Sequence, residues 1–271
     1  MKTSRYIVYF GMLFLILSCD SPTESNFENY VYPLSLENTW IYEGSLLMES
    51  MNDRSEVYDI SYNDTIIVDS IYSEIDNIYR FKTITSWYPT NEDQNISGGG
   101  STGFEYFSNT EEGLYFYSHL GDGSSVVPWS SINSRLYYKI NGELFSINEL
   151  ISLLNHKNIS YRGLDETPLL SIKYPIIIGE QWNYRDGIPW IMDKRVIEDD
   201  GQTFTIQTLY DMDQDLSWEQ DLRVFHTYSN IGLVNFRLEV DSLIMMDEIG
   251  NSSDNYYRSI QNHNLIEYQI D

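Results

Sequence analysis

The chain has 271 residues and a formal net charge of -25 at neutral pH, from 41 Asp and Glu against 16 Lys and Arg. A surface this acidic repels phosphate backbones and anionic headgroups, which argues against nucleic acid as a partner. Apolar residues make up 42% of the chain and aromatic residues 15%, which excludes a disordered protein and allows a sizeable core. The only cysteine, Cys19, excludes an intramolecular disulfide and a zinc–thiolate site.

The first 18 residues have the form of a targeting segment. Lys2 and Arg5 give a positive start, and an apolar run follows from Tyr6 to Leu17. This run has the length of a signal-peptide core and is shorter than the ~20 residues needed to span a bilayer as a helix. We therefore expect residues 1–18 to be a signal peptide that inserts into the membrane transiently.

The end of the apolar run resembles the lipobox of bacterial lipoproteins. Ile16, Leu17 and Ser18 precede Cys19, as aliphatic residues and a small residue precede the cysteine of that motif. The resemblance implies cleavage before Cys19, a diacylglycerol on its sulfur and an acyl chain such as palmitate on the new amino terminus. Two or more acyl chains hold a protein stably on a bilayer. The resemblance thus implies a lipid-anchored envelope protein, with the inner membrane, the outer membrane and the cell surface as alternatives.

A polar segment follows the cysteine. Residues 19–29 contain Pro22 and have the composition of a flexible tether, so order should begin near Tyr30. We expect residues 30–271 to form one β-rich domain.

One aromatic pattern occurs twice in this domain. Tyr32-Pro33, Trp40 and Tyr42 return as Tyr174-Pro175, Trp182 and Tyr184 at a constant offset (174 − 32 and 184 − 42 both equal 142). Four identities at one spacing predict two related halves, residues 30–168 and 169–271. In each copy the Trp and the Tyr are two residues apart, so both should point into the core from the same face of a strand.

These segments also resemble a Pro-Leu-x-x-Gly-x-x-Trp-x-Tyr pattern of uncharacterised secreted bacterial lipoproteins. The second copy keeps the glycine as Gly179, whereas the first has Glu37 at that position, so the first turn should be built differently. The resemblance implies no catalytic residue.

Most of the remaining chain has the residue pattern of antiparallel strands. Thr65–Ile75 and Asn77–Trp87 should form a hairpin, as should Trp190–Glu198 and Gln202–Tyr210 around an Asp-Gly turn. The chain should end in a paired strand, Tyr256–Ile270. The other expected strands are Phe104–Phe107, Gly113–His119, Arg135–Ile140, Leu169–Lys173, Leu222–Tyr228 and Gly232–Met245.

Two segments interrupt the strand pattern. Thr90–Gly103 contains three successive glycines and has no apolar periodicity, which predicts a loop. Ser146-Ile147-Asn148-Glu149 is a capping box and predicts a short amphipathic helix as far as His156. The expected fold class is therefore mainly antiparallel β: a curved sheet or half-barrel, or two related β halves, with one short helix.

One acidic segment carries oxygen ligands at alternate positions, as a calcium-binding loop does. These residues are Asp211, Asp213, Asp215, Ser217 and Glu219. Leu216 and Leu222 stand where such a loop has its glycine and its closing glutamate. We therefore expect a solvated acidic strand end, with a weak Ca2+ site as the alternative.

No catalytic set can be selected from the sequence. The four histidines, His119, His156, His226 and His263, do not show the short spacing of a local metal pair. Gly121-Asp122-Gly123-Ser124-Ser125 lacks the Gly-x-Ser-x-Gly pattern of a nucleophile elbow. Carboxylates are too numerous for a glycosidase pair to be singled out. We name no catalytic residue and expect no cofactor apart from the weak Ca2+ alternative.

Several functions remain open. The first is a non-enzymatic envelope lipoprotein whose curved sheet binds an apolar ligand or a protein partner. The alternatives are a secreted hydrolase of an envelope or extracellular polymer, a structural spacer and a weak calcium-binding surface protein. A concave apolar cavity would favour ligand binding, a cleft holding carboxylates with or without histidine would favour a hydrolase, and a filled core would favour a spacer.

Overall fold

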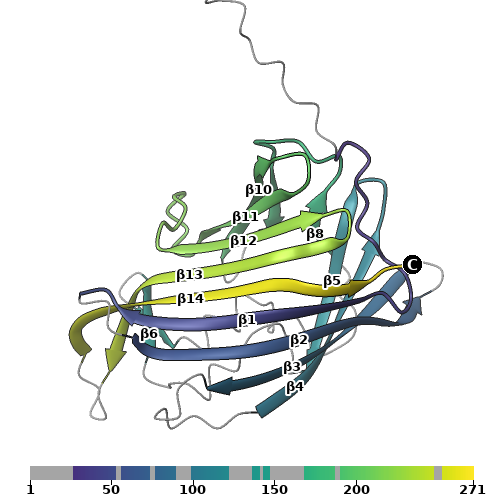
Figure 1. The fold of residues 1–271 in the computed structure, drawn as a ribbon. Helices are drawn as coiled ribbons and strands as arrows, with labels where there is room; N and C mark the ends of the chain where they lie inside the picture. Colours follow the sequence, from purple (N-terminus) through teal and green to yellow (C-terminus); the bar gives the residue numbers. More distant parts are fainter. Residues whose placement is uncertain are drawn as a thin grey trace, which may run out of the picture.

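The structure is a computed structural model, and it describes residues 27–52, 56–73, 77–89, 99–121, 136–140, 143–146, 168–186, 190–246 and 252–271. These residues form fourteen antiparallel β-strands and no helix. Twelve of the strands make one sheet that curls into a nearly closed barrel (Figure 1). The predicted class, mainly antiparallel β with a curved sheet, is confirmed.

The strands fall into two sequence groups. The first group is β1 (Thr39–Ser50), β2 (Glu56–Ser73), β3 (Ile78–Pro89), β4 (Gly99–Asn109), β5 (Gly113–Gly121), β6 (Leu136–Ile140) and β7 (Glu143–Ser146). The second is β8 (Leu169–Lys173), β9 (Gln181–Arg185), β10 (Ile191–Asp199), β11 (Phe204–Asp211), β12 (Leu222–Ser229), β13 (Gly232–Met246) and β14 (Ser252–Gln269). The barrel order is β8-β5-β4-β3-β2-β1-β14-β13-β12-β11-β10-β9; β6 pairs with β13, and β7 pairs with β6.

The predicted hairpins are present. Strand β2 pairs with β3, and β10 pairs with β11 around a turn in which Gly201 has a φ of 81°. The final strand, β14, pairs with β1 on one side and with β13 on the other, which joins the two sequence groups.

Part of the predicted loop is a strand. Gly99–Gly103 begins β4 and pairs with Thr83–Trp87 of β3, so the loop prediction is wrong for these five positions. A Cβ on Gly99 would lie 2.4 Å from Cζ2 of Trp87, so the glycine leaves room for the indole. Of the predicted helix, Ser146 ends β7, and residues 147–156 lie outside the described residues.

The packed part of the chain starts earlier than the sequence indicates. Residues 1–26, including the predicted signal peptide and Cys19, lie outside the described residues. Phe27, assigned to the tether, is only 1% exposed, and its ring lies 4.9 Å from that of Phe204. An aromatic ring assigned to the tether is therefore part of the core, three residues before Tyr30.

The turns before the two repeated aromatic pairs are built alike. Glu37 and Gly179 occupy equivalent positions, and both have a positive φ, 70° and 80°. The amide of Glu37 donates to the carbonyl of Val68 at 2.9 Å, and that of Gly179 donates to the carbonyl of Val196 at 2.8 Å. The expectation of a different first turn is thus wrong, because Glu37 adopts the left-handed conformation that glycine adopts without strain.

The repeated tryptophans occupy the core, as expected. Trp40 is 0% exposed and Trp182 is 7% exposed. The indole of Trp40 donates to the carbonyl of Ile231 at 2.6 Å, and that of Trp182 donates to the carbonyl of Leu170 at 2.8 Å. The division into two related halves stays a prediction.

Inward-facing side chains form two apolar clusters. The first, which we call the Leu46 cluster, includes Leu46, Met48, Ile60, Tyr62, Tyr184, Met192, Tyr210, Val224, Leu238 and Val240. The second, the Phe27 cluster, includes Phe27, Tyr32, Trp40, Tyr42, Phe81, Leu114, Trp182, Phe204 and Tyr228. Aromatic rings dominate the second cluster, and they fill wide interior space at a low cost in side-chain entropy.

A glycine in β1 makes room for a tyrosine that crosses it. Gly44 pairs with Tyr62 on β2 and with His263 on β14, and a Cβ on Gly44 would lie 2.0 Å from Cζ of Tyr62. The Tyr62 hydroxyl donates to the carbonyl of Asn262 at 3.0 Å and accepts a hydrogen bond from Nε2 of Gln261 at 3.0 Å. The ring therefore links β2 to β14 across β1.

Gly44→Ala should lower the free energy of unfolding by on the order of 3 kcal/mol, because the new methyl group would displace the Tyr62 ring and its hydrogen bonds. Urea unfolding measures this loss. Ser45→Ala, at the next position, should change stability by less than about 0.5 kcal/mol. In a Tyr62→Ala background Gly44→Ala should cost much less, and an equal cost in both backgrounds would contradict the proposed packing.

Candidate functional site

The barrel contains a cavity of about 190 Å³. Its wall includes Tyr210 and Leu238 from the Leu46 cluster and Phe81 and Leu114 from the Phe27 cluster, so the cavity lies where the two clusters meet. Engineered protein cavities of about 150 Å³ bind benzene. This cavity therefore has room for one aromatic ring with a small substituent.

Polar side chains interrupt the largely apolar wall. Those other than tyrosine are Glu105, Ser171, Lys194, Thr208 and His226. They come from β4, β8, β10, β11 and β12, so both ends of the sheet order contribute to the cavity. An apolar cavity with a few convergent polar groups has the composition of a small-molecule site.

Lys194 points inward because of the alternation of β10. Met192, Lys194 and Val196 are all buried, and the residues between them are more exposed. Lys194 pairs directly with Trp182 on β9 and with Thr208 on β11. The lysine is 6% exposed, and burial lowers the pKa of its amine to about 7.

The Lys194 amine closes the open side of the barrel. The described parts of β8 and β9, the two ends of the sheet order, are not joined by a backbone ladder. Nζ of Lys194 donates to the carbonyl of Ser171 on β8 at 3.1 Å, one residue beyond the carbonyl that accepts from the Trp182 indole. Nζ also lies 4.2 Å from the ring centroid of Tyr184, which stabilises a positive charge.

A bulge in β8 makes this contact available. Leu114 pairs with Ile172 whereas Tyr115 pairs with Leu170, so Ser171 is an extra residue on β8. A β-bulge leaves its extra residue out of the ladder and changes the direction of that residue's groups. Ser171 thereby lines the cavity and offers its carbonyl to Lys194.

His226 faces the cavity from β12 as a neutral imidazole. Burial and the nearby Lys194 charge lower its pKa to about 3. Its ring centroid lies 5.0 Å from that of Phe236, and its Nδ1 has no hydrogen-bond partner among the described residues. The imidazole therefore offers an unused polar atom.

A second buried pair lies apart from the cavity wall. Oδ2 of Asp64 lies 3.2 Å from Nε2 of His263, and both side chains are 1% exposed or less. Burial raises the pKa of Asp64 to about 7 and lowers the pKa of His263 to about 3. We interpret the pair as a protonated carboxyl beside a neutral imidazole at slightly acidic pH. Neither residue lines the cavity.

The structure brings together three of the five predicted calcium ligands. Single carboxylate oxygens of Asp211, Asp213 and Asp215 lie within 4.8 Å of one another, and Glu219 is not part of this group. The amide of Ser217 donates to Oδ1 of Asp215 at 2.8 Å. Both oxygens of Asp211 accept backbone amide hydrogens, from Asp215 and Leu216, each at 3.1 Å. These hydrogen bonds stabilise the loop, and they use the same carboxylate oxygens that a bound ion would need. The Ca2+ site stays a prediction.

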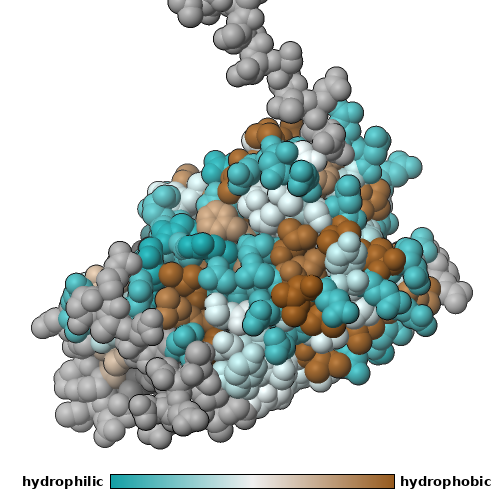
Figure 2. All heavy atoms as spheres, in the orientation of Figure 1, coloured by the Kyte–Doolittle hydropathy of each residue, from teal (hydrophilic) through white to brown (hydrophobic). Residues whose placement is uncertain are grey.

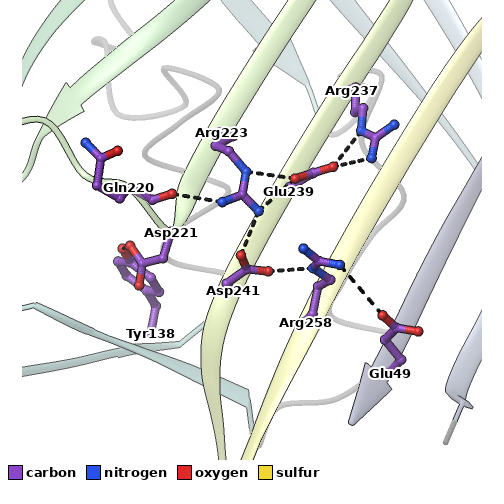
Figure 3. Close-up of polar contacts among 9 residues, drawn as sticks. All are labelled: Glu49, Tyr138, Gln220, Asp221, Arg223, Arg237, Glu239, Asp241 and Arg258. Carbon is purple, nitrogen blue, oxygen red and sulfur yellow. Dashed lines mark hydrogen bonds and ion pairs between the residues drawn. The ribbon is translucent and has the colours of Figure 1, made fainter. Parts of the chain in front are cut away.

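The outer wall carries an alternating chain of charges (Figure 3). Arg223 and Arg258 contact carboxylates on the neighbouring strand β13 at 2.6 to 2.7 Å, and a longer contact of 3.9 Å ends the chain. Arg237 pairs with Glu239 on its own strand. In order these residues are Arg237, Glu239, Arg223, Asp241, Arg258 and Glu49. Every member has a partner, so the chain is a cross-strand brace on β12, β13, β14 and β1.

The residues that sequence reasoning singled out have different outcomes. Trp40, Tyr42, Trp182 and Tyr184 are buried, and Tyr184 also lines the cavity. The side chains of His119 and His156 lie outside the described residues. Lys194 was missed, although it shares the parity of the apolar residues Met192 and Val196, which is the signal that could have identified it.

Comparisons with known proteins do not assign a family. No protein-family model matches the chain. No curated protein matches it either. Among solved structures, a triple mutant of the Rh. blastica porin is similar over 84% of this chain and 99% of that chain, with 8% sequence identity and a TM-score of 0.26. A likeness at this score carries no argument. No described segment is a helix long and apolar enough to cross a membrane.

Asp64→Asn should change the pH dependence of stability. The folded pKa of Asp64, about 7, lies above its ordinary value of 3.8. Below pH 4 the carboxyl is neutral in both states and burying it carries no charge penalty. As the pH rises to 7 the unfolded chain gains the stability of the ionised carboxylate, so the free energy of unfolding falls. The variant should gain stability over the wild type between pH 4 and pH 8, by on the order of 4 kcal/mol. Urea unfolding at each pH gives this difference. An equal difference between variant and wild type at pH 4 and at pH 8 would contradict this expectation.

Proposed function

We propose that this chain is a lipid-anchored protein of the bacterial cell envelope that binds a small apolar ligand inside its barrel. The observation that carries the proposal is the cavity of about 190 Å³ between the two apolar clusters. It fits the ligand-binding alternative better than a protein partner, because the apolar surface faces inward and is too small for a peptide segment.

The polar groups in the wall support a binding role over that of a spacer. A filled core would contain apolar side chains, since each buried polar group without a full set of partners destabilises the fold. Lys194 is nevertheless buried in the wall, and His226 is half-buried there. Groups that destabilise a fold and converge on a cavity are typical of functional sites.

A hydrolase has weaker support. Asp64 and His263 form a buried histidine–carboxylate pair that does not line the cavity. His226 and Glu105 do line it, but Nδ1 of His226 accepts or donates no hydrogen bond among the described residues, so no carboxylate orients this imidazole through that atom. General acid–base catalysis requires the side chain to come within hydrogen-bond reach of the substrate. We therefore propose a role without catalysis.

The surface supports a barrel that stands in water beside a membrane. Figure 2 shows hydrophilic side chains over much of the face formed by β12, β13, β14 and β1, where the charged brace lies. Exposed aliphatic side chains occur in both repeated turns: Leu36 in the first and Ile177 and Ile178 in the second. The eight Cα–Cα steps from Cys19 to Phe27 can span at most about 29 Å. A lipid on Cys19 would hold the barrel close to the bilayer.

Toluene should bind the full-length protein, and Val224→Phe should abolish this binding. Val224 lines the cavity, so a phenyl ring at this position would occupy the space that the ligand needs. Isothermal titration calorimetry measures the affinity, and circular dichroism shows whether the variant keeps its strand content. Val234→Phe adds the same volume at a position that does not line the cavity and should bind toluene like the wild type. Unchanged toluene binding by a folded Val224→Phe variant would contradict the proposal.

Cys19→Ser should move the protein from the membrane fraction to the soluble fraction of its native host. The serine oxygen cannot carry the thioether-linked lipid, and residues 1–18 are predicted to be removed or to insert only transiently. Immunoblots of the separated fractions test this expectation. Unchanged partitioning of the variant would refute the anchor.

A further inference from the structure

The amine of Lys194 is left with fewer partners than an ammonium group uses. An ammonium group has three N–H donors. Nζ has one acceptor, the carbonyl of Ser171, and one ring face, that of Tyr184. Among the residues that the structure describes, no carboxylate forms an ion pair with Lys194. A positive charge here is therefore incompletely compensated.

The missing partner has to come from within the cavity. Lys194 lies in a row of inward side chains that crosses four strands, with Thr208, Val224 and Leu238 as its successive cross-strand neighbours. All four line the cavity. A ligand in this space contacts apolar side chains at one end of the row and finds an amine and a hydroxyl at the other.

We propose that the ligand is a small carboxylic acid with a single aromatic ring or a short branched chain, and that its carboxylate pairs with Lys194. This inference rests on the ligand-binding function proposed above. The volume limits the apolar part to about one ring. A carboxylate supplies the counter-ion that Lys194 lacks, and its second oxygen can accept a hydrogen bond from the Thr208 hydroxyl or from a protonated nitrogen of His226.

The rival role for Lys194 is purely structural, as a donor that closes the gap between β8 and β9. Two probes of nearly equal shape separate these roles: benzoate carries the negative charge, and nitrobenzene is neutral. A structural lysine would leave the two probes with similar affinities. A counter-ion lysine would favour benzoate.

Lys194→Met removes the amine and keeps the length and apolar stem of the side chain. In titration calorimetry on the full-length proteins at pH 6.5, the wild type should bind benzoate at least about tenfold more tightly than nitrobenzene. The variant should bind benzoate at least about tenfold more weakly than the wild type, which is the effect expected for the loss of one charged hydrogen-bonded pair. It should keep its nitrobenzene affinity within about threefold, which shows that the cavity is intact.

The affinity for benzoate should also depend on pH. Burial holds the pKa of Lys194 at about 7 in the free protein, so the benzoate affinity should fall by about tenfold per pH unit above pH 7, while the nitrobenzene affinity stays level. The other titratable groups that face the cavity are His226 and Tyr228 on β12, Tyr184 on β9, Tyr210 on β11, Glu105 on β4 and Tyr32 before β1. Burial raises the pKa values of Tyr32 and Tyr228 above their usual range. The pKa of His226 is about 3, and burial raises the pKa values of Tyr184 and Tyr210 above their usual range.

The outcomes are distinct. Loss of benzoate binding in Lys194→Met, with nitrobenzene retained and the pH profile flattened, supports the assignment. Equal affinities of the wild type for both probes, or unchanged benzoate binding by the variant, would overturn it and leave the apolar ligand function intact. If neither these probes nor toluene binds the wild-type protein, both proposals fail.

Discussion

The interior of a twelve-stranded barrel has to be filled, and this constraint governs the rest of the structure. Eight strands enclose a space that ordinary side chains fill, and the diameter grows with each added strand. This chain meets the demand with aromatic residues: Trp40, Tyr42 and Tyr62 are all 1% exposed or less, on adjacent strands. The high aromatic content of the sequence thus has a geometric cause. Where the rings do not meet, a cavity remains.

The gap between β8 and β9 shows a second consequence of the same constraint. A fully closed sheet would pair these two strands by backbone hydrogen bonds along their length. Here the bulge at Ser171 and the donors Trp182 and Lys194 replace part of that ladder. Side-chain donors hold the strands in place while leaving polar atoms at the cavity wall. The irregular closure and the polar site therefore have one structural origin.

The elements that depend on local pattern could be predicted from the sequence. Alternation identified the long strands, the Asp-Gly turn placed one hairpin, and the repeat predicted that Trp40 and Trp182 would be buried. The glycine pattern gave a wrong loop prediction where the glycine makes room for a neighbouring side chain. Gly99 lies in a strand and leaves space for the indole of Trp87. The joining of the two strand groups into one sheet could not be predicted, since the pairing of β1 with β14 joins residues more than 200 positions apart.

The candidate site could not be predicted either, because contacts between strands far apart in the sequence decide where the Lys194 amine lies. Lysine in a strand is normally read as a solvent-facing residue, and the charge next to it, Arg195, reinforces that interpretation. Only the three-dimensional position of β8 shows that the Lys194 amine ends in an apolar interior. The parity of the strand nevertheless contains the information, because Met192 and Val196 face the same side.

The three buried ionisable groups around the interior differ in what they can do. Asp64 and His263 lie beside each other outside the cavity wall, so each can remain neutral, and folding then avoids burying their charge. Lys194 has no such neighbour, and it destabilises the fold most at and below about pH 7, where its amine would be protonated in the unfolded chain; this cost declines as the pH rises toward 10.5. An anionic ligand would remove that penalty and gain the ion pair in the same step. Burial of the Lys194 amine destabilises its charged form, and only an opposite charge offsets this cost. A neutral ligand of equal size therefore cannot stabilise the charged amine in the same way.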